Sequence, residues 1–164
     1  IVTQFLDYAK GSKPEWQKVD INKAIENTLL LIDHRIIQQK ITLKKVFAPL
    51  PLISCDPERI AQLFLNVFLN ALDAMGNEEK LEIVTKNTDG FVQIKIKDSG
   101  SGIPESIKAR IFQPFVTTKP KGLGLGLAIV HRIVEEHKGT IKVHTKLQKG
   151  TIFTISLPLE TKKD

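Results

Sequence analysis

The sequence has almost nothing that could crosslink a fold. Its 164 residues contain a single cysteine, Cys55, which excludes a disulfide within the chain. A chain of this length buries roughly 70% of its unfolded surface, so it needs no disulfide or metal to hold a core. No catalytic motif surrounds Cys55, so we expect a small buried residue in a protein of the reducing cytosol.

Aromatic residues, long apolar runs and clustered charge are also lacking. Aromatics make up 6% of the chain, and no apolar run approaches the about 20 residues of a membrane-spanning helix. The net charge is +6, but the basic residues, mostly lysine, are spread along the chain rather than clustered with aromatics. Nucleic-acid binding is therefore not expected, whereas an anionic small ligand or an acidic protein partner remains compatible. The chain begins at Ile1 without a signal peptide, and we expect a cytoplasmic piece of a longer protein.

The hydrophobic pattern predicts an α+β fold, with antiparallel hairpins and three main helices on one face of a sheet. Asp20 and Asp56 are suitable N-caps, and Asp89-Gly90 is a strong hairpin signal. The loop at 49–54 and the loop at 112–122 carry little signal of either kind. We expect helices over 21–39, 57–75, 104–111 and 123–137, and strands over 17–20, 41–47, 80–87, 91–98, 140–147 and 150–158.

A polar stripe runs along the otherwise apolar helix at 57–75. Its members step by three or four residues and so share one face: Arg59, Gln62, Asn66, Asn70 and Asp73. A solvent-exposed face would account for Arg59 and Gln62. Asparagine is a poor helix former, however, and its amide oxygen is a suitable ligand for Mg²⁺, which is commonly shared with substrate phosphates. From the stripe alone, a solvent face and a metal-binding face stay equally open.

Two glycine-rich segments follow. The loop DSGSGIP places Asp98 at the end of a strand, where a fixed carboxylate could accept a hydrogen bond from the amine of adenine but would repel the carbonyl of guanine. The segment KGLGLGLAIV opens a helix with Gly122, Gly124 and Gly126, and free backbone N–H groups there suit phosphates. Its spacing fits neither a Rossmann fingerprint nor a P-loop. The loop FQPFVTTKPKG at 112–122, which leads into the second segment, could close over a ligand as a lid. The competing interpretations are a plain turn at DSGSGIP, a flexible hinge at KGLGLGLAIV and a surface loop at 112–122.

The order of these motifs resembles the catalytic ATP-binding domain of sensor histidine kinases. NVFLNALDA resembles the asparagine box of that family, DSGSGIP and GLGLGLAI its two glycine boxes, and FQPF its phenylalanine box. The resemblance covers about residues 15–159 and extends to the gyrase, heat-shock-chaperone and mismatch-repair ATPases. It implies a two-layer α/β sandwich of the Bergerat type, with a mixed, mostly antiparallel sheet under three helices and ATP between the helices and the lid.

The resemblance also implies roles for residues. Asn70 would hold Mg²⁺ against the phosphates of ATP, Asn66 would assist it, and Lys119 would reach the terminal phosphate; these are the expected catalytic residues. Asp98 would bind the adenine amine, Phe112 and Phe115 would anchor the lid, and the glycines would approach the ligand. The other expected cofactor-binding residues are Asp73, Gly100, Gly102, Ile103, Thr118, Gly122, Leu123, Gly124, Leu125, Gly126, Leu127 and Thr151.

Two positions refine this interpretation. The ATPase relatives have a water-activating glutamate where this chain has Asn66, and an amide cannot take a proton at neutral pH, which favours phosphoryl transfer over hydrolysis. Leu123 stands where many members have Thr or Ser, which removes one hydrogen bond to phosphate.

The resemblance further implies a missing partner domain. The acceptor histidine of the family lies in a helical dimerisation hairpin, and none of the four histidines here sits in such a motif. We therefore expect residues 1–14 to be the tail of that hairpin and a linker, 15–159 the catalytic domain, and 160–164 a polar tail. The expected partners are ATP, the dimerisation domain of the same protein and the receiver domain of a response regulator. This fragment would be a monomer and the full-length kinase a homodimer, with membrane anchoring of the parent left open.

Two other functions remain as alternatives. A serine kinase of the anti-sigma type would use the same fold with another acceptor. A nucleotide-gated binding module would hold ATP without chemistry, an interpretation to which Leu123 and the absent acceptor histidine lend some weight.

Overall fold

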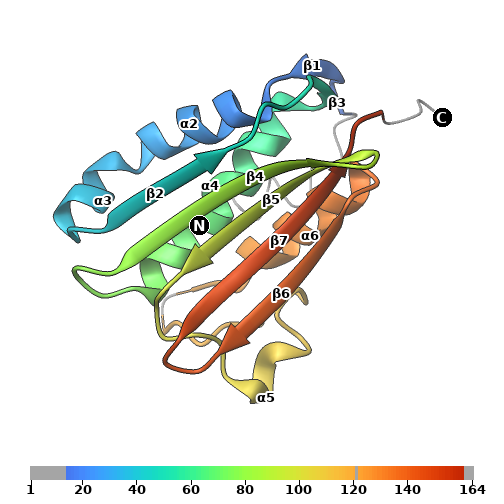
Figure 1. Cartoon of the computed structure of the whole chain (residues 1–164). Coiled ribbons are helices and arrows are strands. Elements are labelled where there is room, and N and C mark those ends of the chain that lie inside the picture. Colours follow the sequence, from blue (N-terminus) through green and yellow to red (C-terminus); the bar gives the residue numbers. More distant parts are fainter. Residues whose placement is uncertain (1–13, 121, 161–164) are drawn as a thin grey trace.

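A five-stranded sheet with helices on one face forms the body of the protein (Figure 1). The computed structural model describes residues 14–120 and 122–160. The strands of this sheet, in spatial order, are β2 (Thr42–Phe47), β4 (Lys80–Thr88), β5 (Phe91–Asp98), β7 (Gly150–Pro158) and β6 (Thr140–Lys146). β2 pairs with β4 in parallel and the other neighbours are antiparallel, so the expected mixed, mostly antiparallel sheet is confirmed.

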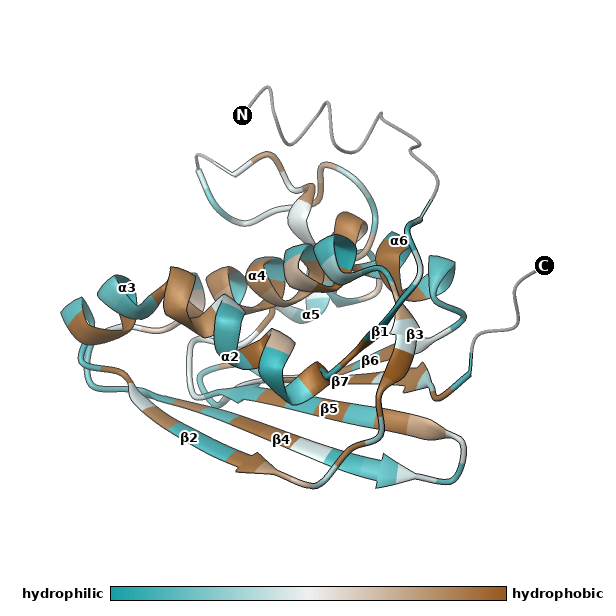
Figure 2. Cartoon of the chain, turned by 90° about the horizontal axis from the view of Figure 1, so that it is seen from above, coloured by the Kyte–Doolittle hydropathy of each residue, from teal (hydrophilic) through white to brown (hydrophobic). Residues whose placement is uncertain are grey.

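Three main helices cover one face of the sheet: α2 (Ile21–Leu31), α4 (Pro57–Ala74) and α6 (Gly126–Glu136). Figure 2 shows them together above the strands, with no described helix on the other side. Along β5, Val92, Ile94 and Ile96 are buried under the helices, while the alternate residues face outward. The α+β sandwich predicted from the alternation of apolar and polar residues is therefore confirmed.

The central helix α4 begins and ends where its sequence predicts. The Asp56 carboxylate accepts hydrogen bonds from the N–H groups of Glu58 and Arg59, and Pro57 occupies the first turn, where its missing N–H costs nothing. One side of α4 packs into the core between α2 and α6 through Ile60, Leu63, Phe64, Val67, Phe68, Ala71 and Leu72. This fixes the direction in which the polar stripe points.

The buried His137 anchors the start of α4 from the end of α6. Its Nδ1–H donates to the Ile133 carbonyl at 2.7 Å, and its Nε2 accepts the Asp56 N–H at 3.0 Å. Burial lowers the pKa of His137 below its ordinary value, so the ring is neutral in this arrangement. This histidine therefore has a packing role.

Three local features differ from the sequence-based prediction. The helix expected over 21–39 is broken at Ile32, whose N–H donates to the carbonyl three residues back, so that α3 (Asp33–Gln38) follows α2 as a separate helix. Within the expected loop at 49–54, Ile53 and Ser54 instead begin β3 (Ile53–Cys55), which pairs with β1 (Gln17–Val19). The helix expected over 104–111 is only α5 (Glu105–Lys108).

The two terminal predictions are not tested. Residues 1–13 of the expected hairpin tail and residues 161–164 of the polar tail lie outside the described residues. Of the helices that the structure describes, none combines the length and the apolar composition that a membrane crossing requires.

Candidate functional site

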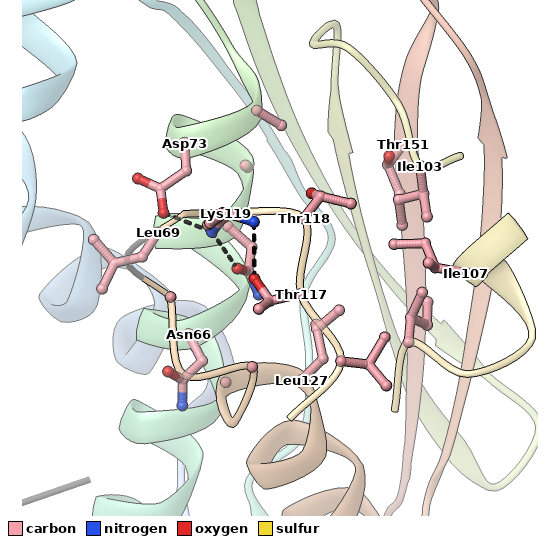
Figure 3. A pocket seen from close by; sticks show the side chains of 18 of the residues that line it. Asn66, Leu69, Asp73, Ile103, Ile107, Thr117, Thr118, Lys119, Leu127 and Thr151 are labelled. Atoms are coloured by element: carbon pink, nitrogen blue, oxygen red, sulfur yellow. Dashed lines mark hydrogen bonds and ion pairs between the residues drawn. The ribbon is translucent and has the colours of Figure 1, made fainter. Parts of the chain in front are cut away.

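A pocket of about 340 Å³ lies between α4, the start of α6 and the end of β5. The lid (residues 112–122, described except for residue 121) borders it on a further side. Figure 3 shows the two sides of the pocket: Asn66, Asp73 and Lys119 lie on one side, and Ile103, Ile107 and Thr151 on the other. The pocket is thus polar where α4 borders it and largely apolar opposite.

The polar side comes from three of the five residues of the stripe on α4. Asn66, Asn70 and Asp73 line the pocket, because the opposite side of α4 is held in the core. Arg59, one end of the stripe, instead forms an ion pair with Glu136 of α6 and lies near the Asp56 carboxylate. The stripe therefore divides into a structural part near the N-terminus of α4 and a part that faces the pocket.

Asp98 lies at the end of β5 with its carboxylate held rigidly. The side chain is buried, and its Oδ1 accepts hydrogen bonds from the N–H groups of Gly100 (3.0 Å) and Thr151 (3.2 Å). Burial raises the pKa of Asp98, and these two N–H donors partly offset the effect. Since both donors share Oδ1, the second oxygen, Oδ2, is the one available to a ligand in the pocket.

Gly100 and Gly150 let the backbone close around Asp98. A Cβ on Gly100 would lie 2.4 Å from the Ala74 carbonyl oxygen, and one on Gly150 would lie 2.0 Å from the Asp98 carbonyl oxygen. Ser101 N–H also donates to the Ala74 carbonyl, which ties the loop after β5 to the end of α4. Gly100 therefore supports Asp98 from behind and is not among the residues that line the pocket.

The start of α6 lies against the two asparagines of α4. A Cβ on Gly126 would be 3.5 Å from Asn66 Oδ1 and 3.7 Å from Asn70 Nδ2, which places the first turn of α6 directly beside them. Gly124 has φ of +68° and passes so close to the backbone of Phe115 and Val116 that a side chain would collide with it. The Phe115 N–H donates to the Gly124 carbonyl, which closes the base of the lid.

Lys119 of the lid reaches across to α4. Its Nζ donates to Asn70 Oδ1 at 2.9 Å and to Asp73 Oδ2 at 2.6 Å. The other oxygen of Asp73 accepts a hydrogen bond from Arg35 of α3 at 2.8 Å. Burial alone would raise the pKa of Asp73, but the hydrogen bonds from Lys119 and Arg35 outweigh it and lower the pKa. Asp73 is therefore a firmly ionised carboxylate between two cations.

Of the eighteen residues expected at the ligand, most line the pocket. The exceptions are Gly100, Phe112 and Phe115. Phe112 packs against the core and His131, as an anchor of the lid should, with ring centroids 5.2 Å apart. Phe115 does not fit the expected anchoring role, because its side chain is 67% exposed and only its backbone fastens the lid.

Sequence reasoning missed the apolar lining and one distant residue. Leu69, Ile107, Ile111, Val116 and Phe153 border the pocket, and only their apolar character marks them in the sequence. Arg35 is outside the pocket, in a helix with no motif, and only the fold brings it to Asp73.

The residues present fit a magnesium ion shared with a ligand, rather than one enclosed by the protein. In the described ranges, no three His, Cys, Asp or Glu side chains come together as a metal centre. Mg²⁺ needs only one or two protein oxygens when phosphates and water supply the rest. Asn70 Oδ1 already accepts a cationic group, the ammonium of Lys119, which indicates that this oxygen is suitably placed for a cation.

Comparisons with known proteins agree with this geometry. The model of the family described as "Histidine kinase-, DNA gyrase B-, and HSP90-like ATPase" matches residues 55–161. The chain is 39% identical over 166 residues to the sensor histidine kinase ZraS of Escherichia coli strain K12, covering 100% of this chain and 36% of ZraS. The chain therefore spans only about a third of the length of this relative.

Solved structures give the same result. The catalytic domain of the histidine kinase ThkA superimposes with a TM-score of 0.81 at 30% identity, covering 89% of this chain and 97% of that domain. Full-length ShkA in complex with AMPPNP gives a TM-score of 0.87 at 29% identity, covering 99% of this chain and 36% of ShkA. ThkA in complex with the response regulator protein TrrA gives 0.82 at 28% identity, covering 96% of this chain and 46% of that chain.

Proposed function

Since the chain belongs to the histidine kinase-, DNA gyrase B- and HSP90-like ATPase family, we propose that it binds ATP with Mg²⁺ and donates the γ-phosphoryl group to a histidine of its parent protein. The chain corresponds to the catalytic ATPase domain of sensor histidine kinases. The nucleotide, the metal and the transfer step are the parts proposed for this chain.

The two-sided pocket is the observation that carries the proposal. Asp98 offers a fixed carboxylate oxygen at one end, suited to the amine of adenine, and Ile103 and Ile107 offer apolar contacts for a base. Asn66 and Asn70 lie on the α4 side next to the first turn of α6, and Lys119 donates to Asn70 there. Phosphates directed toward this side would meet amide oxygens for a shared Mg²⁺, an ammonium and backbone N–H groups.

The carboxylates in the pocket favour transfer over hydrolysis. Of the described residues that line the pocket, Asp73 and Asp98 are the ones that carry carboxylates. Asp73 is held between Arg35 and Lys119 with a lowered pKa, and the second oxygen of Asp98 is assigned to the adenine amine rather than to the phosphates. Neither is placed to accept a proton from water, and Asn66 cannot do so. Catalysis would then depend on positioning the phosphates and neutralising their charge, with bound Mg²⁺ supplying part of that neutralisation.

The phosphoryl acceptor is proposed to lie on another domain. None of the described histidines lines the pocket, and His137 is buried in a structural role. We place the acceptor histidine on a dimerisation domain of the parent, which would make the parent a homodimer and this domain alone a monomer. A response regulator is the proposed final acceptor, by analogy with the ThkA complex, and the domain would act in the cytoplasm.

Calorimetric titration tests the nucleotide site. The chain is titrated with ATP and with GTP, each with Mg²⁺ and with EDTA, while phosphate release is followed in parallel. ATP-selective binding that Mg²⁺ strengthens, with negligible phosphate release, is expected. Equal affinity for ATP and GTP would contradict the adenine assignment, and rapid phosphate release would contradict the transfer assignment.

A further inference from the structure

A continuous row of charged and polar groups links the lid to a helix outside the pocket. Lys119 Nζ contacts Asn70 Oδ1 at 2.9 Å and Asp73 Oδ2 at 2.6 Å, and Arg35 contacts Asp73 Oδ1 at 2.8 Å. The row therefore runs from the lid across two consecutive turns of α4 to α3. Lys119 Nζ contacts Asn70 Oδ1, which is the proposed ligand of Mg²⁺. The ammonium group and the metal ion would therefore compete for the same oxygen.

We propose that Asp73 and Arg35 are positioning residues that govern this competition. Asp73 holds the Lys119 ammonium on Asn70, and Lys119 must leave before Asn70 can hold a metal-bound nucleotide. The inference rests on the proposed function for the identity of the metal and of the nucleotide. The Lys119 latch, meaning the contacts of Lys119 with Asn70 and Asp73, can itself be tested without either.

The exposure of the latch suits a contact that breaks readily. The side chains of Lys119 and Asp73 are 41% and 35% exposed, so water screens their attraction. Partly exposed ion pairs of this kind typically shift an equilibrium by roughly two- to five-fold. A latch of this strength would keep the lid docked on α4 without preventing nucleotide entry.

Arg35 has a distinct role once the latch opens. When Lys119 moves away, Asp73 would be a carboxylate without its lid partner beside the incoming phosphates, and like charges repel. Arg35 contacts the other oxygen, Oδ1, and is not a pocket residue, so it stays in place and neutralises Asp73. While the latch is closed, Arg35 also neutralises part of the negative charge of Asp73, which weakens the attraction between Asp73 and Lys119.

Hydrogen exchange of the nucleotide-free chain tests the latch directly. Lys119→Met removes both contacts of the latch and Asp73→Asn removes its ion pair, so exchange of the lid amides over 112–120 is expected to accelerate two- to five-fold in each. The matched controls are Glu105→Gln and Lys108→Met, which remove the same charges from an ion pair at α5 that does not line the pocket. Lid exchange that is unchanged in the two latch variants would overturn the proposal.

ADP binding in the presence of Mg²⁺ separates the latch from simple charge effects. ADP is chosen because it lacks the terminal phosphate that Lys119 is proposed to reach. If Lys119 must be displaced, both Asp73→Asn and Lys119→Met bind Mg²⁺·ADP two- to five-fold more tightly than the unmodified chain. If only net charge matters, Asp73→Asn binds the anionic nucleotide more tightly and Lys119→Met binds it more weakly, and that opposite pair of signs would overturn the proposal.

A double variant tests Arg35. Arg35→Gln is expected to weaken Mg²⁺·ADP binding two- to five-fold, because Asp73 then holds Lys119 more tightly and repels the phosphates. Arg35→Gln combined with Asp73→Asn should bind like Asp73→Asn alone, since the carboxylate that Arg35 neutralises is gone. If the double variant binds Mg²⁺·ADP more weakly than Asp73→Asn alone, Arg35 acts on the structure rather than through Asp73, and its proposed role would be overturned. Failure of the unmodified chain to bind ADP would refute the proposed function instead, and the exchange experiment would still decide the latch.

Discussion

Replacing Asp98 with asparagine should weaken ATP binding and move selectivity toward guanine nucleotides. Oδ1 of Asp98 accepts hydrogen bonds from the N–H groups of Gly100 and Thr151. The carbonyl oxygen of an asparagine must take the same place, because an amide NH₂ group there would face two donors. The NH₂ group of the new side chain then occupies the Oδ2 position and points at the ligand.

The magnitude follows from the hydrogen bond that is exchanged. A hydrogen bond to a charged group contributes about 1.5–3 kcal/mol, so its loss weakens ATP binding about ten- to one-hundred-fold. In the variant, the adenine amine would face another hydrogen-bond donor. The carbonyl oxygen of guanine would instead accept a hydrogen bond from this new NH₂ group. We therefore expect GTP to bind the variant more tightly than it binds the unmodified chain.

Calorimetric titration of both proteins with ATP and GTP measures this exchange. Thermal unfolding without nucleotide is the folding control, because the replacement keeps the size of the side chain and both backbone hydrogen bonds. Unchanged ATP affinity in a folded Asp98→Asn variant would refute the reasoning, and so would an equal loss for both nucleotides.

Four further predictions concern separate parts of the chain. Asn70→Ala should abolish the strengthening of ATP binding by Mg²⁺, measured by titration with the metal and with EDTA; unchanged metal dependence would remove Asn70 from the site. Gly124→Ala should weaken ATP binding at least ten-fold by displacing the base of the lid, since its Cβ would lie 2.6 Å from the Phe115 backbone, whereas Gly90→Ala, also at positive φ but in open space, should leave binding unchanged. Because burial lowers the pKa of His137 below 6.5, the unfolded chain takes up that proton first, so the free energy of unfolding should fall as the pH drops below about 6.5. Denaturation at a series of pH values measures this slope, which His137→Gln should reduce. Burial, assisted by the neighbouring Asp56, raises the pKa of Cys55 to about 12, so a thiol reagent at pH 8 should modify it only in denaturant.

Local sequence signals predicted the parts of the fold that depend on local chemistry. The cap at Asp56, the turn at Asp89-Gly90 and the alternation along β5 are properties of neighbouring residues, and each appears as predicted. The break at Ile32 was not visible, because 21–39 keeps its helical spacing of apolar residues throughout. The pairing of β3 with β1 joins segments more than thirty residues apart in the sequence, and no local pattern predicts it.

The sequence predicts those site residues that belong to motifs. It does not predict those whose position depends on tertiary packing. Asn66, Asn70 and Asp98 were identified from residue type and position, and the fold brings them around one pocket. Phe115 resembled Phe112 in the sequence, yet only the backbone at Phe115 fastens the lid. Arg35 had no signal at all, because its partnership with Asp73 exists only once α3 packs beside α4.

Phosphoryl transfer within the full-length parent protein is the most direct test of the account. The parent is incubated with γ-labelled ATP and Mg²⁺, and the protein-bound label is then treated with acid and with base. The account predicts label on a histidine outside this domain, lost in acid and retained in base, and absent in the Asn70→Ala variant. Acid-stable label on a serine, or rapid phosphate release without any labelled protein, would contradict it.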